Sequence, residues 1–415
     1  MLLVMNITSP PLFMKKKSLN SLREKNNGFI VASLVAILLT SCFVSFFYLN
    51  SKVLQEISLL TLIIPTIIQI KQKNVDWSSA KKAFFLTTPY LLSLIMALFI
   101  NLNGDEDSEF AAILVANLTF SFSVFSIIGS RKDRDVWHDV MKVIPFLTIP
   151  IFIFVLISQR NAYLMGRWEP YYTGDVTGAH PNWWGLMALG LGWCALAWKN
   201  ILIRFSGLAI AVYYMYLLQS RGALVALVVA FIFCSGYFFP VRPKRIFLLF
   251  ILFLLGTVLI AMTGDGLLDF IANHVLLLND PERGAGTGMS GRTAGYATAW
   301  KAINNAPFLG NGLGVFGFVH NGFLLILAEG GIVTLLSTLF LFATSIRKYK
   351  AIKHWSGLGY VLSYIVLLLT YPRLFNTNMT SLLAMMVITQ GLSYGKQPRD
   401  LPSNAYNLAI TNETK

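Results

Sequence analysis

The chain has 415 residues, of which 55% are hydrophobic and 13% are charged, and its mean hydropathy is +0.63. Soluble domains carry about 25% charged residues, so this composition excludes an ordinary soluble protein and predicts an integral membrane protein. The formal net charge of +14 would also fit a nucleic-acid partner. However, the basic residues gather in alternate loops between apolar stretches, which is typical of a membrane orientation signal and argues against nucleic acid.

The three cysteines, Cys42, Cys194 and Cys234, all lie inside apolar stretches. This placement predicts neither a disulfide framework nor a CxxC metal site. The first apolar stretch follows Lys15–Lys17, is about twenty residues long, and ends in aromatic residues rather than in the small residues of a cleavage site. We therefore expect an uncleaved first span.

Apolar stretches of membrane-spanning length recur along the whole chain and predict an all-α, polytopic membrane protein with about 12 transmembrane helices. The predicted spans are 29–49, 54–70, 83–101, 110–129, 143–158, 181–198, 201–218, 222–239, 246–263, 320–343, 357–371 and 379–394. We expect a cytoplasmic segment at 1–28, a single transmembrane domain at 29–395 and a cytoplasmic tail at 396–415.

Lysine and arginine are distributed unevenly between the two sets of loops. With the N-terminus in the cytoplasm, 25 of the 33 basic residues fall on the cytoplasmic side. This bias fits the positive-inside rule for a chain with both ends in the cytoplasm. Loops on the outer side are then predicted at 159–180 and, as the largest loop, at 264–319 between helices 9 and 10. The few arginines on this outer side are too few to orient the protein, so each needs a local reason.

The outer loop at 159–180 contains Arg160 and Arg167 among clustered Tyr, Trp, Pro and Gly residues. Such aromatic residues form the interfacial belt of membrane proteins, and they could also stack on the apolar faces of sugars. Asn182 follows Pro181 at the mouth of the sixth predicted span, where its amide could point inward.

Arg221 opens the eighth predicted span directly after a tight turn at Gln219-Ser220. The start of a helix favours an anion, because free backbone N–H groups and the positive end of the helix dipole lie there. A membrane-boundary arginine can also simply extend its side chain to water. Arg283 in the large outer loop and Arg373 in the last outer loop are further candidates for binding an anion.

A helix is predicted in the large loop from an N-cap at Ser290 to about Asn304, before Pro307. Arg292 falls in its first turn, where a basic side chain is disfavoured by the dipole and a bound anion would offset the cost. The alternative is a surface arginine with nothing bound. One face of this helix is expected to pack downward and to carry Tyr296, Trp300 and Ile303.

The run Gly310-Asn311-Gly312-Leu313-Gly314 looks like a nucleotide-binding loop, but neither a strand before it nor a Gly-Lys-Ser/Thr after it supports that. We expect it to lie flat against helices. His320 then enters the tenth span, and Gly331 falls near the same helical stripe, where it would let a neighbouring helix approach. An ionisable residue at the mouth of a span favours a function, whereas the deeper Glu329 is interpreted as structural support.

Three outer-side elements together resemble the O-antigen ligase and O-antigen polymerase superfamily of bacterial inner-membrane glycan transferases. They are Ser220-Arg221-Gly222, Gly291-Arg292 in the large loop, and His320-Asn321 followed by Gly331. The stretch from Ser290 to Gly331 is close to the central pattern of the family, and Pro181-Asn182 before Gly185 is similar to another family feature. The resemblance covers residues 200–331 and extends to the other spans by topology only.

This resemblance implies a GT-C-like fold and an inverting transfer, independent of metal and cofactor, at the periplasmic face of the inner membrane. The donor would be a glycan on undecaprenyl diphosphate. The acceptor would be a sugar hydroxyl, carried by lipid A-core for a ligase or by a second carrier-linked glycan for a polymerase. We take the ligase as the leading hypothesis in lipopolysaccharide biosynthesis.

The predicted roles follow from the chemistry of such a transfer. Arg221 and Arg292 would stabilise the departing diphosphate, because guanidinium groups make bidentate, permanently charged contacts with phosphate. His320 would be the general base, since imidazole titrates near neutral pH. The remaining substrate-binding candidates are Arg160, Arg167, Asn182, Arg283, Asn321 and Arg373.

Two other classes of protein fit a chain with many spans. A transporter or flippase commonly shows internal repeats and a cytoplasmic linker between halves. Here no repeat is visible and the large loop is off-centre and outside, which argues against transport. A structural partner in an assembly is the second alternative.

Overall fold

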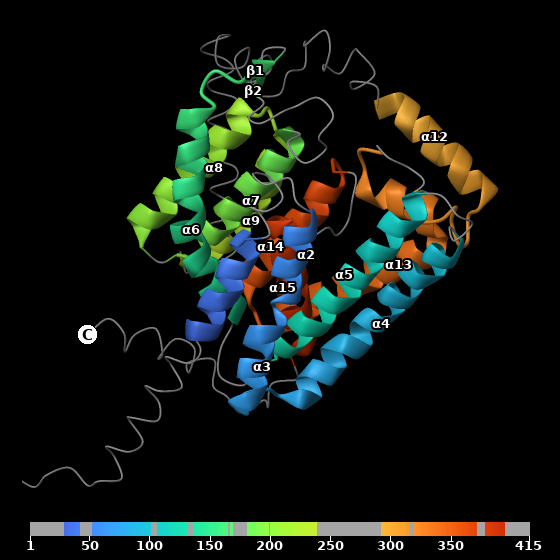
Figure 1. Ribbon diagram of the computed structural model, residues 1–415, viewed down its shortest axis with the longest axis horizontal. Coiled ribbons are helices and arrows are strands. Elements are labelled where there is room, and N and C mark those ends of the chain that lie inside the picture. The colour runs from blue at the N-terminus through green and yellow to red at the C-terminus, as the bar shows by residue number, and fades with distance from the viewer. Residues whose placement is uncertain are drawn as a thin grey trace, which may run out of the picture.

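The computed structural model describes a bundle of helices with one small hairpin (Figure 1). The described residues are 29–41, 52–100, 106–130, 136–164, 167–168, 181–198, 200–238, 292–314, 319–371 and 378–394. The predicted span at 246–263 and the predicted residues Arg283 and Arg373 lie outside these ranges.

The N-terminal part of the bundle begins with the helix Phe29–Ser41, α2 (Lys52–Leu60) and α3 (Ile63–Lys71). The span predicted at 54–70 is therefore two helices, separated by a turn at residues 61–62. Pro65 explains the break: it has no N–H to donate, and its ring collides with the carbonyl one turn earlier, at Thr61.

Three long helices follow, α4 (Trp77–Ile100), α5 (Glu106–Ile128) and α6 (Val136–Ser158). Each is long and apolar enough to cross a membrane. The first and the last begin several residues before the predicted spans. In α4 the reason is a local cap: the Asp76 carboxylate accepts hydrogen bonds from the Ser78 amide at 3.1 Å and the Ser79 hydroxyl at 2.6 Å.

A two-stranded antiparallel hairpin follows α6, with β1 (Tyr163–Leu164) paired to β2 (Arg167–Trp168). The chain then returns through α7 (Pro181–Leu196), α8 (Ile201–Leu217) and α9 (Arg221–Phe238). Helix α7 packs against α6, α8, α9 and α15, and its described side chains are almost all buried. Helices are thus found where the spans 181–198, 201–218 and 222–239 were predicted, within two residues at each end.

The C-terminal half contains α12 (Arg292–Asn305), α13 (Gly322–Ala351), α14 (Trp355–Leu368) and α15 (Met379–Ser393). Helix α15 is buried along its entire length and contacts α4, α5, α7, α13 and α14, so it forms the centre of the bundle. Helix α13 is another helix long enough to span a membrane.

The outside of the bundle is apolar, whereas polar side chains lie inside and bond to the backbone of neighbouring helices. Phe85 on α4 is 74% exposed. In the interior, the Ser363 hydroxyl donates to the Ala226 carbonyl at 2.5 Å and the Thr380 hydroxyl donates to the Leu186 carbonyl at 2.6 Å. Such a distribution is stable in lipid, where apolar residues face the solvent and polar groups join helices. The fold is that of a multi-span, all-α membrane protein, as predicted.

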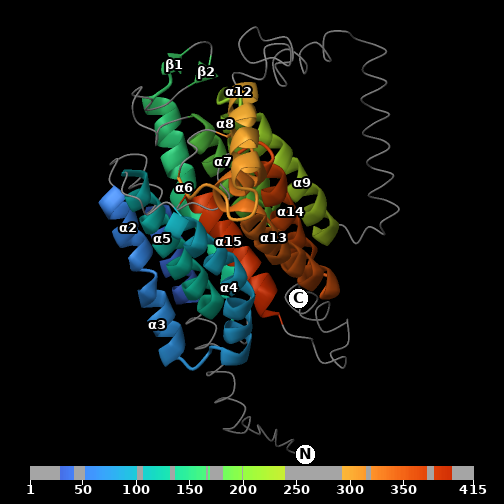
Figure 2. The same ribbon diagram turned by 90° about the vertical axis from the view of Figure 1, so that its right-hand side faces the viewer.

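Helix α12 and the hairpin β1–β2 lie at one end of the bundle in both views (Figures 1 and 2). The turn between α3 and α4 lies at the opposite end. Below, the end that carries α12 and β1–β2 is called the loop end.

Candidate functional site at the loop end of the bundle

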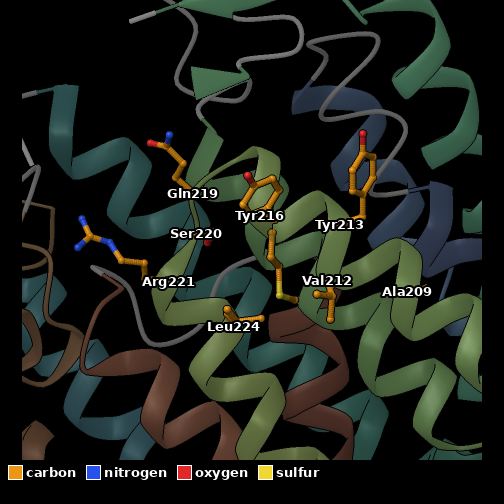
Figure 3. A pocket seen from close by; sticks show the side chains of 9 residues that line it. Ala209, Val212, Tyr213, Tyr216, Gln219, Ser220, Arg221 and Leu224 are labelled. Atoms are coloured by element: carbon orange, nitrogen blue, oxygen red, sulfur yellow. The ribbon is translucent and has the colours of Figure 1, made fainter. Parts of the chain in front are cut away.

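Arg221 is the first residue of α9 and is half-buried (Figure 3). The turn before it is tight: Gln219 has a φ of 51°, and the Ser220 amide donates to the Met215 carbonyl at 2.9 Å. This turn reverses the chain from α8 into α9 and leaves Arg221 at a helix start. The prediction that Arg221 opens this helix is confirmed.

Small residues on both sides of Arg221 allow two other helices to approach. Ser220 lies against Gly185 of α7, where a Cβ would collide with the serine side chain. Gly222 lies against Thr370 in the same way. The Ser-Arg-Gly sequence is therefore explained by packing around the arginine, which the sequence alone did not reveal.

The segment at the end of α14 connects the starts of three helices. Thr370 touches Gly222 of α9, and the Tyr371 carbonyl lies 3.1 Å from the position of a Cβ on Gly322, the first residue of α13. The ring of Tyr371 also meets Trp183 of α7 edge-on, at 5.7 Å between centroids. The starts of α7, α9 and α13 are thus gathered around residues 370–371. Asn182 and Arg221 lie in the first turns of α7 and α9, and His320 lies two residues before α13.

His320 and Asn321 precede α13 rather than lying inside it. The Asn321 side-chain oxygen accepts hydrogen bonds from the amides of Phe323 and Leu324, at 3.1 and 3.0 Å, which is an N-cap. His320 lies one residue earlier and is half-buried. The helical stripe predicted to join His320 to Gly331 is therefore wrong, because His320 does not have helical geometry relative to α13.

Helix α12 packs on the first half of α13 and carries Arg292 as its first residue. Their shared face is built from Tyr296, Ala299, Ala302, Ile303, Val319, Leu324, Leu325, Leu327 and Ala328. The Tyr296 hydroxyl donates to the His320 carbonyl at 3.4 Å, so the helix that begins with Arg292 contacts the residue predicted as the base.

One predicted contact of α12 is wrong. Trp300 was expected to pack downward with Tyr296 and Ile303, but it is 55% exposed. The fully buried Ala299 takes that place in the seam. A small residue permits the close approach of two helices, whereas the indole would hold them apart.

Helix α13 is broken at Gly331, which has φ 66° and ψ −171°. A Cβ here would meet the Phe308 carbonyl and would stand 2.6 Å from the Gly310 nitrogen. The neighbour that approaches Gly331 is thus the glycine-rich loop at 307–314, whereas a helix had been predicted. The prediction that this loop lies flat against helices is confirmed.

The break leaves two carbonyls of α13 without helical partners, and the loop supplies their donors. The Ala328 carbonyl accepts from the Asn311 amide at 3.0 Å, and the Glu329 carbonyl accepts from the Gly312 amide at 3.0 Å. Buried backbone groups must be satisfied within the protein, so the loop and the broken helix depend on each other.

The same loop also satisfies the amides on the other side of the break. The Ile332 amide donates to the Pro307 carbonyl at 2.9 Å, and the Val333 amide donates to the Phe308 carbonyl at 3.3 Å. These bonds replace the two helical bonds that the break removes. The loop is therefore inserted into the backbone ladder of α13.

Two side chains strengthen this insertion. The side-chain nitrogen of Asn311 (Nδ2) donates to the Ala302 carbonyl of α12 at 3.0 Å and to the Ala328 carbonyl of α13 at 2.9 Å. The Glu329 carboxylate accepts from the Gly314 amide at 3.0 Å, which agrees with its predicted structural role. Asn311 was missed by the sequence analysis, although an asparagine within a glycine run was a usable signal.

Three further predicted residues within the described ranges lie near the same end. Arg160 is exposed just after α6, Arg167 belongs to β2, and Asn182 is the second residue of α7. The hairpin is fixed by Trp168, whose indole nitrogen donates to the Gln159 carbonyl at 2.7 Å and whose ring meets Tyr214 at 5.2 Å. Within the described residues, no three His, Cys, Asp or Glu side chains are grouped as a metal site.

Comparison with known proteins identifies the central region of the chain. The model of the family Wzy_C, described as O-antigen ligase, matches residues 206–339. A search of curated proteins finds no match. The matched region runs from α8 into α13 and includes Arg221, Arg292 and His320. Members of the family are membrane glycan transferases of the O-antigen ligase or polymerase type, with lipid-linked glycans as substrates. The chain is therefore a multi-pass membrane protein whose residues 206–339 match the O-antigen ligase family, as its motifs predicted.

Proposed function

We propose that this protein is an O-antigen ligase that transfers a glycan from undecaprenyl diphosphate to a sugar hydroxyl of lipid A-core. One observation carries most of the support. The elements that bear Arg221, Arg292 and His320 belong to one family domain and meet at the loop end: Gly222 lies on Thr370, Gly322 lies on Tyr371, and Tyr296 contacts His320.

The distribution of charge supports a periplasmic site in the bacterial inner membrane. Lys71 and Lys73 lie at the turn between α3 and α4, at the end of the bundle opposite α12. Lys348 and Lys350 lie in the last turn of α13, far along that helix from His320. Basic residues mark the cytoplasmic side of membrane proteins, so the loop end would face the periplasm.

The proposed reaction exchanges one bond to the anomeric carbon of the donor for another. The acceptor hydroxyl oxygen attacks this carbon from the face opposite the diphosphate, and its proton passes to the His320 imidazole. The carbon–oxygen bond to the diphosphate breaks, and the electron pair leaves on the phosphate oxygen. The configuration at the anomeric carbon is inverted.

Two arginines would stabilise the charge that develops on the leaving diphosphate. Arg221 and Arg292 each begin a helix, where backbone N–H groups add to the positive potential. Preorganised positive groups of this kind stabilise a transition state without a divalent cation. We propose that Arg160, Arg167, Asn182, Arg283 and Arg373 bind the phosphates and sugars of the two substrates.

The test is transfer by purified protein between a carrier-linked glycan and lipid A-core. We expect His320→Ala to reduce kcat by about 10²–10⁴-fold, as for loss of a general base. Arg221→Ala and Arg292→Ala should each reduce kcat by about 10²–10³-fold or more. Lys301→Ala, a change of an exposed basic residue on α12, should leave the rate unchanged. Retention of most activity by His320→Ala would refute the assignment of the base.

The acceptor separates a ligase from a polymerase. The matched family is described as O-antigen ligase, which favours lipid A-core as the acceptor. A deletion strain of a ligase accumulates polymer on the carrier and bare core, whereas a deletion strain of a polymerase carries single repeats on the core. Product formation in detergent, without an ion gradient, would exclude a transporter.

A further inference from the structure

A groove of about 340 Å³ lies on the outside of the bundle, where α8 turns into α9 (Figure 3). Arg221 and Gln219 line it at the turn, and Leu224 lines it on α9. Along α8 its wall is formed by Tyr216, Tyr213, Met215, Val212 and Ala209. The groove therefore starts beside the arginine proposed to bind the diphosphate and continues along an apolar and aromatic helix surface.

The polar and apolar parts of the groove are separated along its length. The side chains of Arg221 and Gln219 point to the same side in Figure 3, away from Val212 and Ala209. Ala209 lies seven residues before Tyr216 on α8, which is about 10 Å along a helix. The groove thus leads from the charged loop end toward the middle of the bundle.

The groove opens sideways, toward the surroundings of the bundle. Val212, Tyr213 and Tyr216 are 42%, 50% and 45% exposed. For a helix in a membrane these faces contact lipid, so a lipid chain can enter the groove from the bilayer without crossing the protein.

We infer that this groove holds the first isoprenoid units of the carrier lipid, with the diphosphate of the same molecule at Arg221. This inference rests on the proposed function and adds the path of the lipid chain. The chemistry of the proposed donor identifies the occupant. A diphosphate binds favourably to an arginine at a helix start. In the donor this diphosphate is joined directly to the polyprenyl chain, and the groove begins at that arginine. The branched chain would pack against the tyrosine rings and Leu224, and burial of this apolar surface would contribute to binding of the donor.

The inference predicts that chain length and groove shape act together on donor binding. Ala209→Trp fills the groove about 10 Å from the level of Tyr216. A donor with a full polyprenyl chain should then show a KM raised at least about 10-fold, or about 1.4 kcal/mol of binding, with kcat unchanged. A donor with a single isoprene unit does not extend to Ala209 and should be used as well as by the unaltered protein.

Val225→Trp is the matched control. Val225 lies on α9 next to Leu224, is 50% exposed and does not line the groove. It should change the KM of neither donor. Retained turnover of the one-unit donor by Ala209→Trp also shows that this variant is folded.

A photoreactive side chain provides a second measurement. Placed at Val212 it should capture the carrier lipid, and placed at Val225 it should capture much less. Capture of ordinary phospholipid only at Val212 would overturn the inference, as would an Ala209→Trp variant that alters both donors equally or neither. If the unaltered protein transfers a glycan from neither donor, the proposed function itself fails, and this result is distinct from the other outcomes.

Discussion

Gly310 and Gly331 face each other across the break in α13. Both have positive φ angles, 75° and 66°, and a Cβ on Gly331 would stand 2.6 Å from the Gly310 nitrogen. This contact lets the loop at 307–314 bond to the backbone of the broken helix, and the same loop joins α12 to α13. Arg292 begins α12, and His320, the predicted general base, lies two residues before α13. The glycine pair therefore supports the two helices that carry or follow these predicted site residues.

Gly331→Ala is expected to destabilise the protein strongly. Its backbone conformation is essentially restricted to glycine, which by itself costs about 1–3 kcal/mol for another residue, and the added methyl group meets the Phe308 carbonyl. The effect is measured by heating the purified protein and recording the temperature at which its monodisperse peak in size-exclusion chromatography is lost.

Gly322→Ala in the same helix is the control for Gly331→Ala. Gly322 has no positive φ, and its nearest neighbour would be 3.1 Å from the new Cβ. It should lose clearly less stability. Equal losses for the two variants would show that the break in α13 is not a strained, glycine-dependent feature.

Asn311→Asp is expected to reduce kcat with little change in the KM of the donor. The substitution removes the two donated hydrogen bonds that join Ala302 of α12 to Ala328 of α13 and places a carboxylate beside both carbonyls. Unsatisfied buried groups cost about 1–3 kcal/mol, which corresponds to as much as about 100-fold in rate if the relative position of the two helices is lost.

Asn311→Gln retains an amide donor and should recover part of the rate. Asn305→Asp adds a similar charge at the exposed end of α12 and should have little effect. An Asn311→Asp variant with normal kcat would contradict a positioning role. If the variant lowers only the amount of folded protein in the membrane, Asn311 is needed for folding and does not position the site.

Asn321 distinguishes capping from direct contact with the substrate. Asn321→Ala should destabilise the start of α13 by about 0.5–2 kcal/mol and displace His320, which lowers kcat. Asn321→Asp keeps an oxygen for the Phe323 and Leu324 amides. Activity restored by Asp would indicate that the cap is what matters, whereas loss with both variants would indicate that the amide itself binds the substrate.

Trp168→Ala is expected to release the hairpin β1–β2 from the bundle. The indole is buried, bonds the Gln159 carbonyl and packs on Tyr214. Trypsin should then cleave after the exposed Arg160 faster than in the unaltered protein, as mass spectrometry of the fragments would show. Trp300→Ala, which removes a mostly exposed indole, should leave this cleavage unchanged, and unchanged cleavage in both variants would refute the anchoring role.

The sequence predicted local features well where one physical signal dominated. Apolar length identified α8, α9 and α15 within two residues, and the N-terminal preference for anions focused attention on Arg221. It failed where neighbours decide: Trp300 and Ala299 are adjacent on α12, and periodicity cannot tell which of them faces α13. Residues 54–70 were also predicted as one span, because hydropathy does not register the clash between the Pro65 ring and the Thr61 carbonyl.

The amino-acid sequence by itself predicted that the chain crosses the membrane many times, predicted an orientation from the distribution of its charges, and indicated which arginines and which histidine lie near the starts of helices. These properties depend on each residue's own solvation and on short spacing along the chain. The tertiary structure decided which helix starts lie next to one another. Thr370 and Tyr371 bring α9 and α13 together, and the loop at 307–314 completes the broken α13. Such contacts join residues far apart in the sequence, and their geometry is set by close approach of backbones, which no local pattern encodes.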